Sequence, residues 1–448
     1  MNTTTPKPVD WDAVASELAG MDIITEPSQV TKLSLDYYHF SQILQPLLGH
    51  KRGDLVVRPT SEVEVLRVAN VCVKYKVPVT VRGAGTGNYG QCIPLQGGVI
   101  LDTTRMNAIR WIKPGLACVE PGVKLAAFDK KSREIGWELR MAPSTYRTAT
   151  IGGFISGGSG GIGSINYGQL RDRGNLHGVR VVTLEDEPHL IELRGDDVQK
   201  VNHAYGTNGI ITELEIPLAP AYPWAEVIVI FDNFMTAARF GQVLADSDGL
   251  IKKLISIHAS PIPSYFAALK SYLPEGKHCA LLMVAESCLE PFQDLVREYG
   301  GEITYQKTAQ EASKGNSLAE FTWNHTTLHA RSVDPSLTYL QTFFFTLERV
   351  EQLYHYFGDE VMMHLEFLRV NGKAIPAGLQ IVRYTTPERL HEIIRYHEEE
   401  GAFIANPHTY ILEDGGRKMI DVEQLKFKER VDPFGLMNPG KMRAWEER

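Results

Sequence analysis

Two glycine-rich segments contain the residue pattern in this chain that is best suited to chemistry. They read VRGAGTGNYGQ at residues 81–91 and TIGGFISGGSGGIG at residues 150–163. Because glycine has no side chain, backbone N–H groups in such segments can approach an anion directly. One segment alone would be explained by a tight surface turn, but the two together predict a bound cofactor that carries phosphate.

The first segment includes a G-x-G-x-x-G match at residues 85–90, directly after a short predicted strand at 77–81. In a dinucleotide fingerprint of this type, the last glycine opens a helix that crosses back to a parallel strand. Here only residues 91–98 precede the next predicted strand, at 99–101, and they include a proline and two glycines. No crossover helix fits, so the sequence argues against a nicotinamide-type fold.

The composition is that of a globular protein without a nucleic-acid partner. The 448 residues are 43% hydrophobic and 22% charged, which is ordinary for such proteins. The 46 basic and 54 acidic residues give a net charge of −8, without basic blocks that could follow a nucleic-acid backbone.

The lengths of the apolar runs and the pattern of cysteines argue against several kinds of protein and site. Neither the N-terminus nor any other part approaches the roughly 20 apolar residues that cross a bilayer, so we expect no membrane span and a cytoplasmic location. The five cysteines are odd in number and never spaced as C-x-x-C. This pattern argues against a disulfide framework, a thiolate metal site and an iron–sulfur cluster.

Local sequence patterns predict two domains, of which the first holds the glycine segments. Ser61 and Glu64 form a capping-box pair for a helix to about Lys76, and short strands follow on both sides of the glycine segments. The proline-rich stretch LAPAYPW near residue 220 then marks a domain boundary. Beyond it, strands alternate with amphipathic helices, which indicates a helix-covered antiparallel sheet.

Four motifs, in this order, resemble those of the p-cresol methylhydroxylase or vanillyl-alcohol oxidase type of FAD-binding flavoproteins. VRGAGTGNYGQ is similar to the family's RGGGTGLSGG loop, APSTYRTATIGG to PDPSS…TIGG, YGTNGIITE to GSEGTLGIVTE, and NPGKM to NPGK. The resemblance covers about residues 55–218 and 432–441. Within the FAD domain the chain most resembles glycolate oxidase and D-2-hydroxy-acid dehydrogenase-like members.

The resemblance implies an α+β fold, with a two-part FAD-binding domain of mixed sheets and an α+β cap domain built on an antiparallel sheet. The expected boundaries are 1–220 for the FAD-binding domain, 221–399 for the substrate cap and 400–448 for a C-terminal return to the FAD domain. By position, the residues implied to bind FAD are Gly83, Ala84, Gly85, Thr86, Gly87, Asn88, Pro143, Ser144, Thr150, Gly153, Ser156, Gly209, Ile211, Asn438 and Lys441.

Departures from the family pattern refine this expectation. Where family members attach flavin covalently through a histidine or a cysteine, this chain has Thr86 and Tyr146, so we expect FAD to be held without a covalent bond. The 2-hydroxy-acid subgroup carries paired-histidine metal motifs, HVGDGNLH and EHGIG, and neither is present here. We therefore expect no metal, and the 2-hydroxy-acid specificity stays open.

Histidines are the candidates for the base that takes a hydroxyl proton. His408, in ANPHTYILE, lies in irregular sequence and is the leading candidate, with Tyr410 as an assisting hydrogen-bond donor; a plain turn histidine is the alternative. His325 shares helical spacing with Leu318, Phe321 and Leu328, and His329 follows one turn later. The pair could serve a substrate pocket, and an i, i+4 pair can also bind a metal, although no third ligand is visible and core or surface histidines are the commoner outcome.

Other side chains have weaker claims to the site. Asn438 and Lys441 would steady negative charge on reduced flavin, or form a C-terminal turn. For an acidic substrate, the candidate residues to bind its carboxylate are Arg331, Arg369 and Arg383. An arginine exposed on a cap strand without such a role is the commoner outcome. Aromatic residues 343–345 alternate faces of a strand, so at least part of them belongs to the core.

We therefore expect an FAD-dependent oxidase or dehydrogenase that transfers a hydride from an alcohol or 2-hydroxy acid to the flavin. A phenol or aromatic-alcohol oxidase of the same family is one alternative, and a non-enzymatic flavin-binding module is another. The partners would be a small-molecule substrate and either oxygen or another electron acceptor. A homodimer is one option for the assembly, which the sequence leaves undecided.

Overall fold

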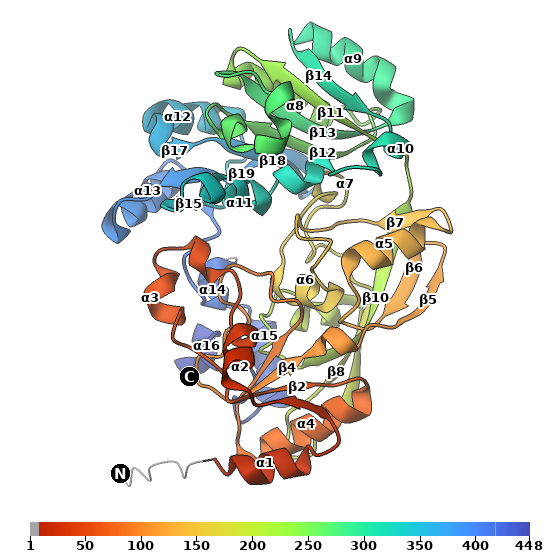
Figure 1. Cartoon of the computed structure of the whole chain (residues 1–448), viewed down its shortest axis with the longest axis vertical. Helices are drawn as coiled ribbons and strands as arrows, with labels where there is room; N and C mark the ends of the chain where they lie inside the picture. Colours follow the sequence, from red (N-terminus) through yellow and green to blue (C-terminus); the bar gives the residue numbers. More distant parts are fainter. Residues whose placement is uncertain (1–8, 417) are drawn as a thin grey trace.

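The computed structural model describes residues 9–416 and 418–448. The chain forms two parts that meet across a junction, with the N-terminal part below and the green-to-blue cap above in Figure 1. The C-terminal segment returns from the cap to the lower part, where it lies among N-terminal elements. No helix among the described residues is long and apolar enough to span a membrane.

A small mixed sheet begins the lower part. Its strand order is β1-β2-β4-β3, with β1 antiparallel to β2 and the other neighbours parallel. Apolar side chains of the sheet and of helix α4 share one core cluster. The elements are α1 (Trp11–Glu17), β1 (Asp22–Ile24), α2 (Pro27–Ser34), α3 (Leu44–Leu48), β2 (Leu55–Arg58), α4 (Glu62–Tyr75), β3 (Val79–Arg82) and β4 (Val99–Asp102).

Helix α4 begins as the sequence predicts, with one difference in the cap. The Ser61 hydroxyl accepts a hydrogen bond from the Glu64 backbone N–H at 3.3 Å. The Glu64 carboxylate, however, accepts from the Thr60 N–H at 2.6 Å instead of from that of Ser61. The Ser61 bond satisfies a donor that the helix start leaves without a partner inside the helix, and the Glu64 bond ties the preceding residue to the first turn.

A second sheet in the lower part is antiparallel, with the order β5-β6-β10-β8-β9 and β7 paired to β10. Its core cluster takes in α5, α6 and two residues of the C-terminal return, Phe427 and Val431. The elements are β5 (Ile109–Lys113), β6 (Leu116–Val119), α5 (Leu125–Arg133), β7 (Trp137–Leu139), α6 (Ile151–Gly157), α7 (Ser164–Tyr167), β8 (Gly178–Val182), β9 (Leu190–Arg194) and β10 (Ile210–Pro220).

The connection from β3 to β4 contains no helix, which confirms that prediction. The two strands are nevertheless parallel, with Val79 opposite Val99. The chain crosses between them through the glycine-rich residues 83–98. On the other side of β3, the C-terminal return pairs in parallel through Val79 and Met437, and the Asn438 N–H donates to the Val79 carbonyl at 2.8 Å.

The cap is an eight-stranded sheet in the order β14-β11-β13-β12-β18-β19-β16-β21, and every neighbouring pair in it is antiparallel. This confirms the antiparallel cap predicted from the sequence. Its strands are β11 (Trp224–Phe231), β12 (Lys252–His258), β13 (His278–Ala285), β14 (Glu302–Lys307), β16 (Thr342–Phe343), β18 (His364–Val370), β19 (Lys373–Gly378) and β21 (Phe403–Ile404).

Helices cover the cap sheet and bury the largest core cluster of the chain. A short sheet of β15 (Leu337–Tyr339), β17 (Val361–Met362) and β20 (Ile381–Arg383) lies beside it. The helices are α8 (Phe234–Asp246), α9 (Leu289–Glu298), α10 (Ala309–Ala312), α11 (Asn324–Val333), α12 (Leu347–Phe357) and α13 (Pro387–Glu399).

Strand membership locates the changes between the two parts. The expected boundary at residue 220 falls between β10, which ends at Pro220, and β11, which begins at Trp224. Strand β21 at Phe403–Ile404 still pairs with the cap strand β16. The chain therefore leaves the cap sheet only after Ile404, and the return carries α14 (Leu412–Gly415), α15 (Val422–Val431) and α16 (Arg443–Glu446).

Candidate functional site

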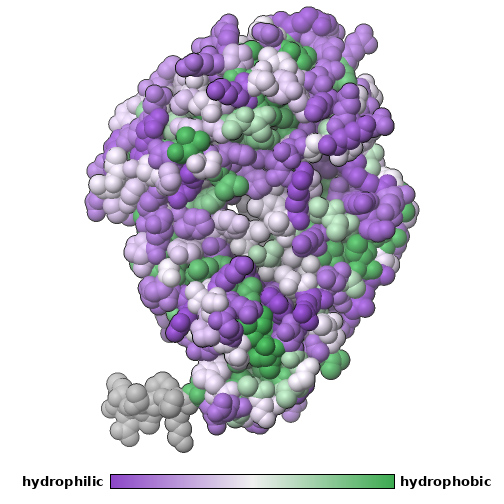
Figure 2. All heavy atoms as spheres, viewed as in Figure 1, coloured by the Kyte–Doolittle hydropathy of each residue, from purple (hydrophilic) through white to green (hydrophobic). Residues whose placement is uncertain are grey.

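A cavity of about 510 Å³ lies between the glycine-rich segments and the cap. On the face drawn in Figure 2 the surface is hollowed at the junction of the two parts. Both glycine segments line the cavity, together with cap residues from α11, β16, β18 and β19. The structure therefore brings together segments that lie far apart in the sequence.

The first glycine segment lines the cavity directly after β3. A Cβ atom on Gly83 would lie 2.1 Å from the Thr150 hydroxyl oxygen, and one on Gly85 would lie 1.9 Å from the Arg82 Nη2 atom. Gly85 also has a positive φ of 68°, which favours glycine. Because side chains have no room at these two positions, the cavity meets bare backbone, as a bound diphosphate requires.

The second glycine segment begins helix α6. Thr150 is the N-cap residue, and its hydroxyl accepts a hydrogen bond from the Gly153 N–H at 3.4 Å. Every residue implied by the resemblance to bind FAD lines the cavity except Asn438 and Lys441. Those that line it are Gly83, Ala84, Gly85, Thr86, Gly87, Asn88, Pro143, Ser144, Thr150, Gly153, Ser156, Gly209 and Ile211.

Arg82 and Gln91 are among the cavity residues that sequence reasoning missed. The buried Arg82 guanidinium lies under the first glycine segment and donates to the Ala84 carbonyl at 3.2 Å, which places a positive charge beside the loop. Gln91 links the two segments, because its amide donates to the Gly157 carbonyl at 3.3 Å. Their signal was available in the sequence, since both residues flank the first glycine run.

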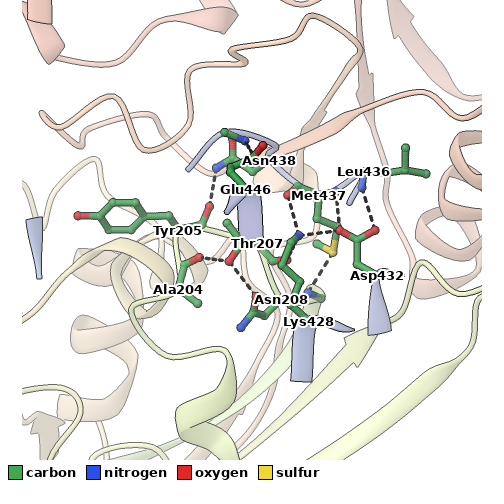
Figure 3. Close-up of polar contacts among 12 residues, drawn as sticks. Ala204, Tyr205, Thr207, Asn208, Lys428, Asp432, Leu436, Met437, Asn438 and Glu446 are labelled. Atoms are coloured by element: carbon green, nitrogen blue, oxygen red, sulfur yellow. Dashed lines mark hydrogen bonds and ion pairs between the residues drawn. The ribbon is translucent and has the colours of Figure 1, made fainter. Parts of the chain in front are cut away.

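The C-terminal return supports the loop at residues 203–209, which lines the cavity through His203, Tyr205, Gly206 and Gly209. In Figure 3 the Lys428 ammonium lies between this loop and the return. It donates to the Thr207 carbonyl at 2.9 Å and to the Asp432 carboxylate at 2.7 Å. Burial lowers the pKa of Lys428, and the nearby Asp432 carboxylate opposes this shift.

Asn438 and Lys441 hold the loops from behind instead of facing the cavity. The Asn438 amide donates to the Tyr205 carbonyl at 2.6 Å and to the Gln91 carbonyl at 2.8 Å. The Lys441 ammonium is fully buried and donates to the Gly90 carbonyl at 2.5 Å. This position differs from the one implied by the resemblance, because the return docks against the outer side of the glycine loop.

His408 lies outside the cavity lining, and so does Tyr410, which packs with its ring 5.0 Å from the Lys441 ammonium. The buried His408 ring lies between the Ser41 hydroxyl at 2.8 Å and the Tyr339 carbonyl at 2.9 Å. Burial lowers the pKa of His408 to about 4. With both ring nitrogens engaged away from the cavity, His408 joins three segments of the fold, and this location does not favour it as the base.

His325 lines the cavity, as does Leu328, whereas Leu318 and Phe321 belong to a buried core cluster. The four residues therefore do not share one helical face, in contrast to their spacing. The chain breaks between them at Trp323, which has a φ of 52° and precedes α11. This break turns His325 toward the cavity.

The charged neighbour of His325 is Glu320. One Glu320 carboxylate oxygen lies 3.3 Å from the His325 Nδ1 atom, and the other lies 2.8 Å from the Arg147 Nε atom. Burial alone would raise the pKa of Glu320, but the hydrogen bond from His325 and the charges of His325, Arg147 and His329 outweigh it and lower that pKa. Glu320 is therefore an anion that links the FAD side of the cavity to the cap.

His329 and the three predicted arginine clamps lie elsewhere. The His329 ring stacks on Phe321 with centroids 4.7 Å apart, and its Nε2 atom lies 3.0 Å from the Glu320 carbonyl. Outside the cavity lining, Arg331, Arg369 and Arg383 each donate to backbone carbonyl groups. These arginines therefore cannot hold a ligand in the cavity without leaving their partners.

Aromatic residues 343–345 divide as the alternation predicts. Phe343 lines the cavity, Phe344 is fully buried in the cap core and Phe345 is exposed. Among the described residues, no group of three or more His, Cys, Asp or Glu side chains is arranged to hold a metal ion.

Comparison with known proteins agrees with the geometry of the glycine segments. Residues 53–189 match the family described as FAD binding domain. Glycolate oxidase subunit GlcD of Escherichia coli strain K12 is 31% identical over 202 residues, which cover 43% of this chain and 40% of that protein. A D-lactate dehydrogenase of Anaerostipes hadrus is 32% identical over 187 residues, covering 39% of this chain and 38% of that protein.

The overall arrangement also resembles a solved structure. Alkyldihydroxyacetonephosphate synthase superposes with a TM-score of 0.72 at 17% identity, covering 98% of this chain and 87% of that one. This likeness shows the fold, including the cap. The sequence matches, by contrast, span only about two fifths of the length of the curated relatives.

Proposed function

We propose that this chain, whose residues 53–189 match the family described as FAD binding domain, is an oxidoreductase that transfers a hydride from a CH–OH group to FAD. The observation that carries the proposal is the shared cavity, in which the backbone of the FAD domain faces His325 of the cap. Glycolate oxidase subunit GlcD and D-lactate dehydrogenase, which match this domain, are named for the same class of reaction.

The cavity fits the proposed cofactor. Residues 83–88 would hold the diphosphate through backbone N–H groups, with the charge of Arg82 beneath them, and Gly209 and Ile211 would meet the adenosine side. When bound, FAD supplies the hydride acceptor. Thr86 stands where a covalent histidine link would form, and burial raises the pKa of the nearby Cys92 thiol to about 11, so we propose non-covalent attachment.

His325 is the base in this proposal. Its Nδ1 atom faces the Glu320 carboxylate at 3.3 Å, which favours the tautomer with the proton on Nδ1 and the lone pair on Nε2. The ring can then accept the substrate's hydroxyl proton at Nε2, and the Glu320 charge stabilises the imidazolium that forms. His408 and Tyr410, away from the cavity, have no place in this step.

An aromatic-alcohol oxidase is a second candidate, and the cap wall favours it. Leu328, Phe343, Leu368 and Leu379 give the cap side of the cavity an apolar surface that suits a ring-bearing substrate. A non-enzymatic flavin-binding module is the third hypothesis.

Anaerobic mixing of the FAD-loaded protein with a panel of aliphatic alcohols, aromatic alcohols and 2-hydroxy acids tests these readings. Loss of flavin absorbance with a donor supports an enzyme, and the class of donor separates the first two candidates. Reduction by dithionite but by no donor in the panel would support the binding module.

Replacing His325 by glutamine tests the base. We expect flavin reduction to slow by about 10²- to 10⁴-fold, the usual contribution of general base catalysis, with FAD content unchanged. The exposed His355 of helix α12 is the matched control, and His355→Gln should leave the rate as it is. An unaltered rate in His325→Gln would remove the assignment.

The remaining partners are also proposals. Oxygen or another electron acceptor would reoxidise the flavin, and stopped-flow mixing of the reduced protein with oxygen measures one of these routes. A cytoplasmic location and a homodimer are testable by cell fractionation and by sedimentation of the purified protein.

A further inference from the structure

We propose that Arg147 is the anchor for a carboxylate group on the substrate and that Glu320 competes with this group for the same guanidinium. The inference rests on the proposed oxidation of a CH–OH group and narrows the substrate to a 2-hydroxy acid. Three observations support it. Arg147 lines the cavity, its ion pair with Glu320 is partly exposed to solvent, and the same Glu320 carboxylate also contacts His325.

Arg147 comes from the FAD domain and lines the cavity where that domain meets Glu320 of the cap. Its guanidinium carries five N–H donors in a planar fork that matches a carboxylate. The Nε atom pairs with Glu320 at 2.8 Å, and the Tyr146 side chain also contacts the guanidinium. With 48% of the side chain exposed, the fork retains donors for a ligand.

The other arginine of the cavity lining has a different position. Arg82 is buried and donates to the carbonyls of Leu35 and Ala84 beneath the first glycine segment, where a diphosphate would lie. Among the described residues, Arg147 is thus the arginine that lines the cavity beside the cap. It takes the role that the sequence assigned to the three arginines that lie outside the lining.

Glu320 connects the anchor to the base. Its two carboxylate oxygens lie 2.8 Å from Arg147 Nε and 3.3 Å from His325 Nδ1. The guanidinium and the imidazole are therefore separated by one carboxylate. A 2-hydroxy acid carries its carboxylate and its hydroxyl on adjacent carbons, so it can contact the guanidinium while its hydroxyl proton faces His325.

The ion pair between Arg147 and Glu320 is weak enough to be exchanged. Ion pairs with this much solvent exposure contribute little to stability, so a substrate carboxylate can displace Glu320 from part of the fork at small cost. Glu320 keeps its contact with His325 after such an exchange. Removing the charge of Glu320 should therefore strengthen carboxylate binding and, at the same time, slow proton transfer.

Oxalate and 1,2-propanediol are the probes for this inference. Oxalate carries carboxylate groups, whereas the diol has the structure of lactate with a CH2OH group in place of the carboxylate. Their dissociation constants are measured from the perturbation of flavin absorbance in the FAD-loaded protein. In Arg147→Gln we expect oxalate to bind about 10- to 100-fold more weakly, with diol binding unchanged. Arg147→Lys should restore part of the affinity, and Glu320→Gln should bind oxalate more tightly than the unaltered protein.

Three outcomes would overturn the inference. The first is equal oxalate affinity in Arg147→Gln and the unaltered protein, including no binding in either. The second is an equal loss of oxalate and diol binding, which would show that the ion pair only connects the FAD domain to the cap. The third is reduction of the flavin by the diol together with an unchanged rate of reduction by lactate in Arg147→Gln, which would remove the anchor and leave the proposed oxidation standing. Oxalate binding through Arg147, with no donor able to reduce the flavin, would instead remove the proposed oxidation.

Discussion

The Thr150 hydroxyl oxygen lies 2.1 Å from the point that a Cβ atom on Gly83 would occupy. The two glycine-rich segments thus touch at a place where one of them has no side chain and the other begins helix α6. Their contact fixes the spacing of the two backbone surfaces that line the cavity.

Gly83→Ala should therefore weaken FAD binding. The added methyl group must push Thr150 from its N-cap position, and overpacking of this kind typically costs about 1–3 kcal/mol, or roughly 5- to 150-fold in affinity. Fluorescence titration of the apoprotein with FAD measures the effect. The control is Gly249→Ala, where a Cβ atom would meet nothing within 4 Å; equal affinities of the two variants would contradict the prediction.

The buried pair of Lys428 and Asp432 provides a second test (Figure 3). Asp432→Ala leaves the ammonium buried with its two carbonyl partners, Thr207 and Met437. Breaking a buried pair in this way costs about 3–5 kcal/mol, and the loop at residues 203–209 should lose order with it.

Urea unfolding and FAD titration measure both effects of this change. The double variant Lys428→Met, Asp432→Leu removes the charges together and should unfold at a higher urea concentration than Asp432→Ala. A single variant as stable as the unaltered protein would show that the pair does not support the loop.

The pH dependence of stability should report on His408. Its pKa of about 4 in the folded protein lies below its ordinary value of 6.5. The unfolded chain therefore binds this proton first, and stability is lost as the pH falls from about 6.5 to about 4. Between pH 7 and pH 5 this histidine alone should remove about 2 kcal/mol.

Urea unfolding at the two pH values measures this loss, and His408→Gln should show a smaller one. His397, whose pKa burial also lowers to about 4, stays in both proteins and loses its share equally. An identical loss in the variant would contradict the assignment to His408.

The break before α11 depends on Glu366. This buried carboxylate accepts hydrogen bonds from the Trp323 N–H at 2.8 Å and from the Ser256 hydroxyl at 2.7 Å. Glu366→Ala should release the left-handed backbone at Trp323, displace His325 and slow flavin reduction, by about 10-fold or more for a small misplacement. Glu366→Gln retains an acceptor oxygen and should recover most of the rate; stopped-flow reduction of both variants checks this difference.

The sequence by itself determined the glycine segments, the absence of a crossover helix between β3 and β4 and the antiparallel cap. These features depend on local properties, namely the lack of a Cβ atom at particular positions and the alternation of apolar residues along strands. Their chemistry is the same wherever the chain folds, so they could be predicted from residue type and spacing.

Only the tertiary structure decided which polar side chains reach the cavity. His325 and His408 were both candidates for the base. The break at Trp323 brings His325 to the cavity. Hydrogen bonds to Ser41 and Tyr339 hold His408 away from it. The partnership of Arg147 with Glu320 joins residues of different domains. Such placements arise from long-range packing and from a backbone torsion, neither of which leaves a periodic signal in the sequence.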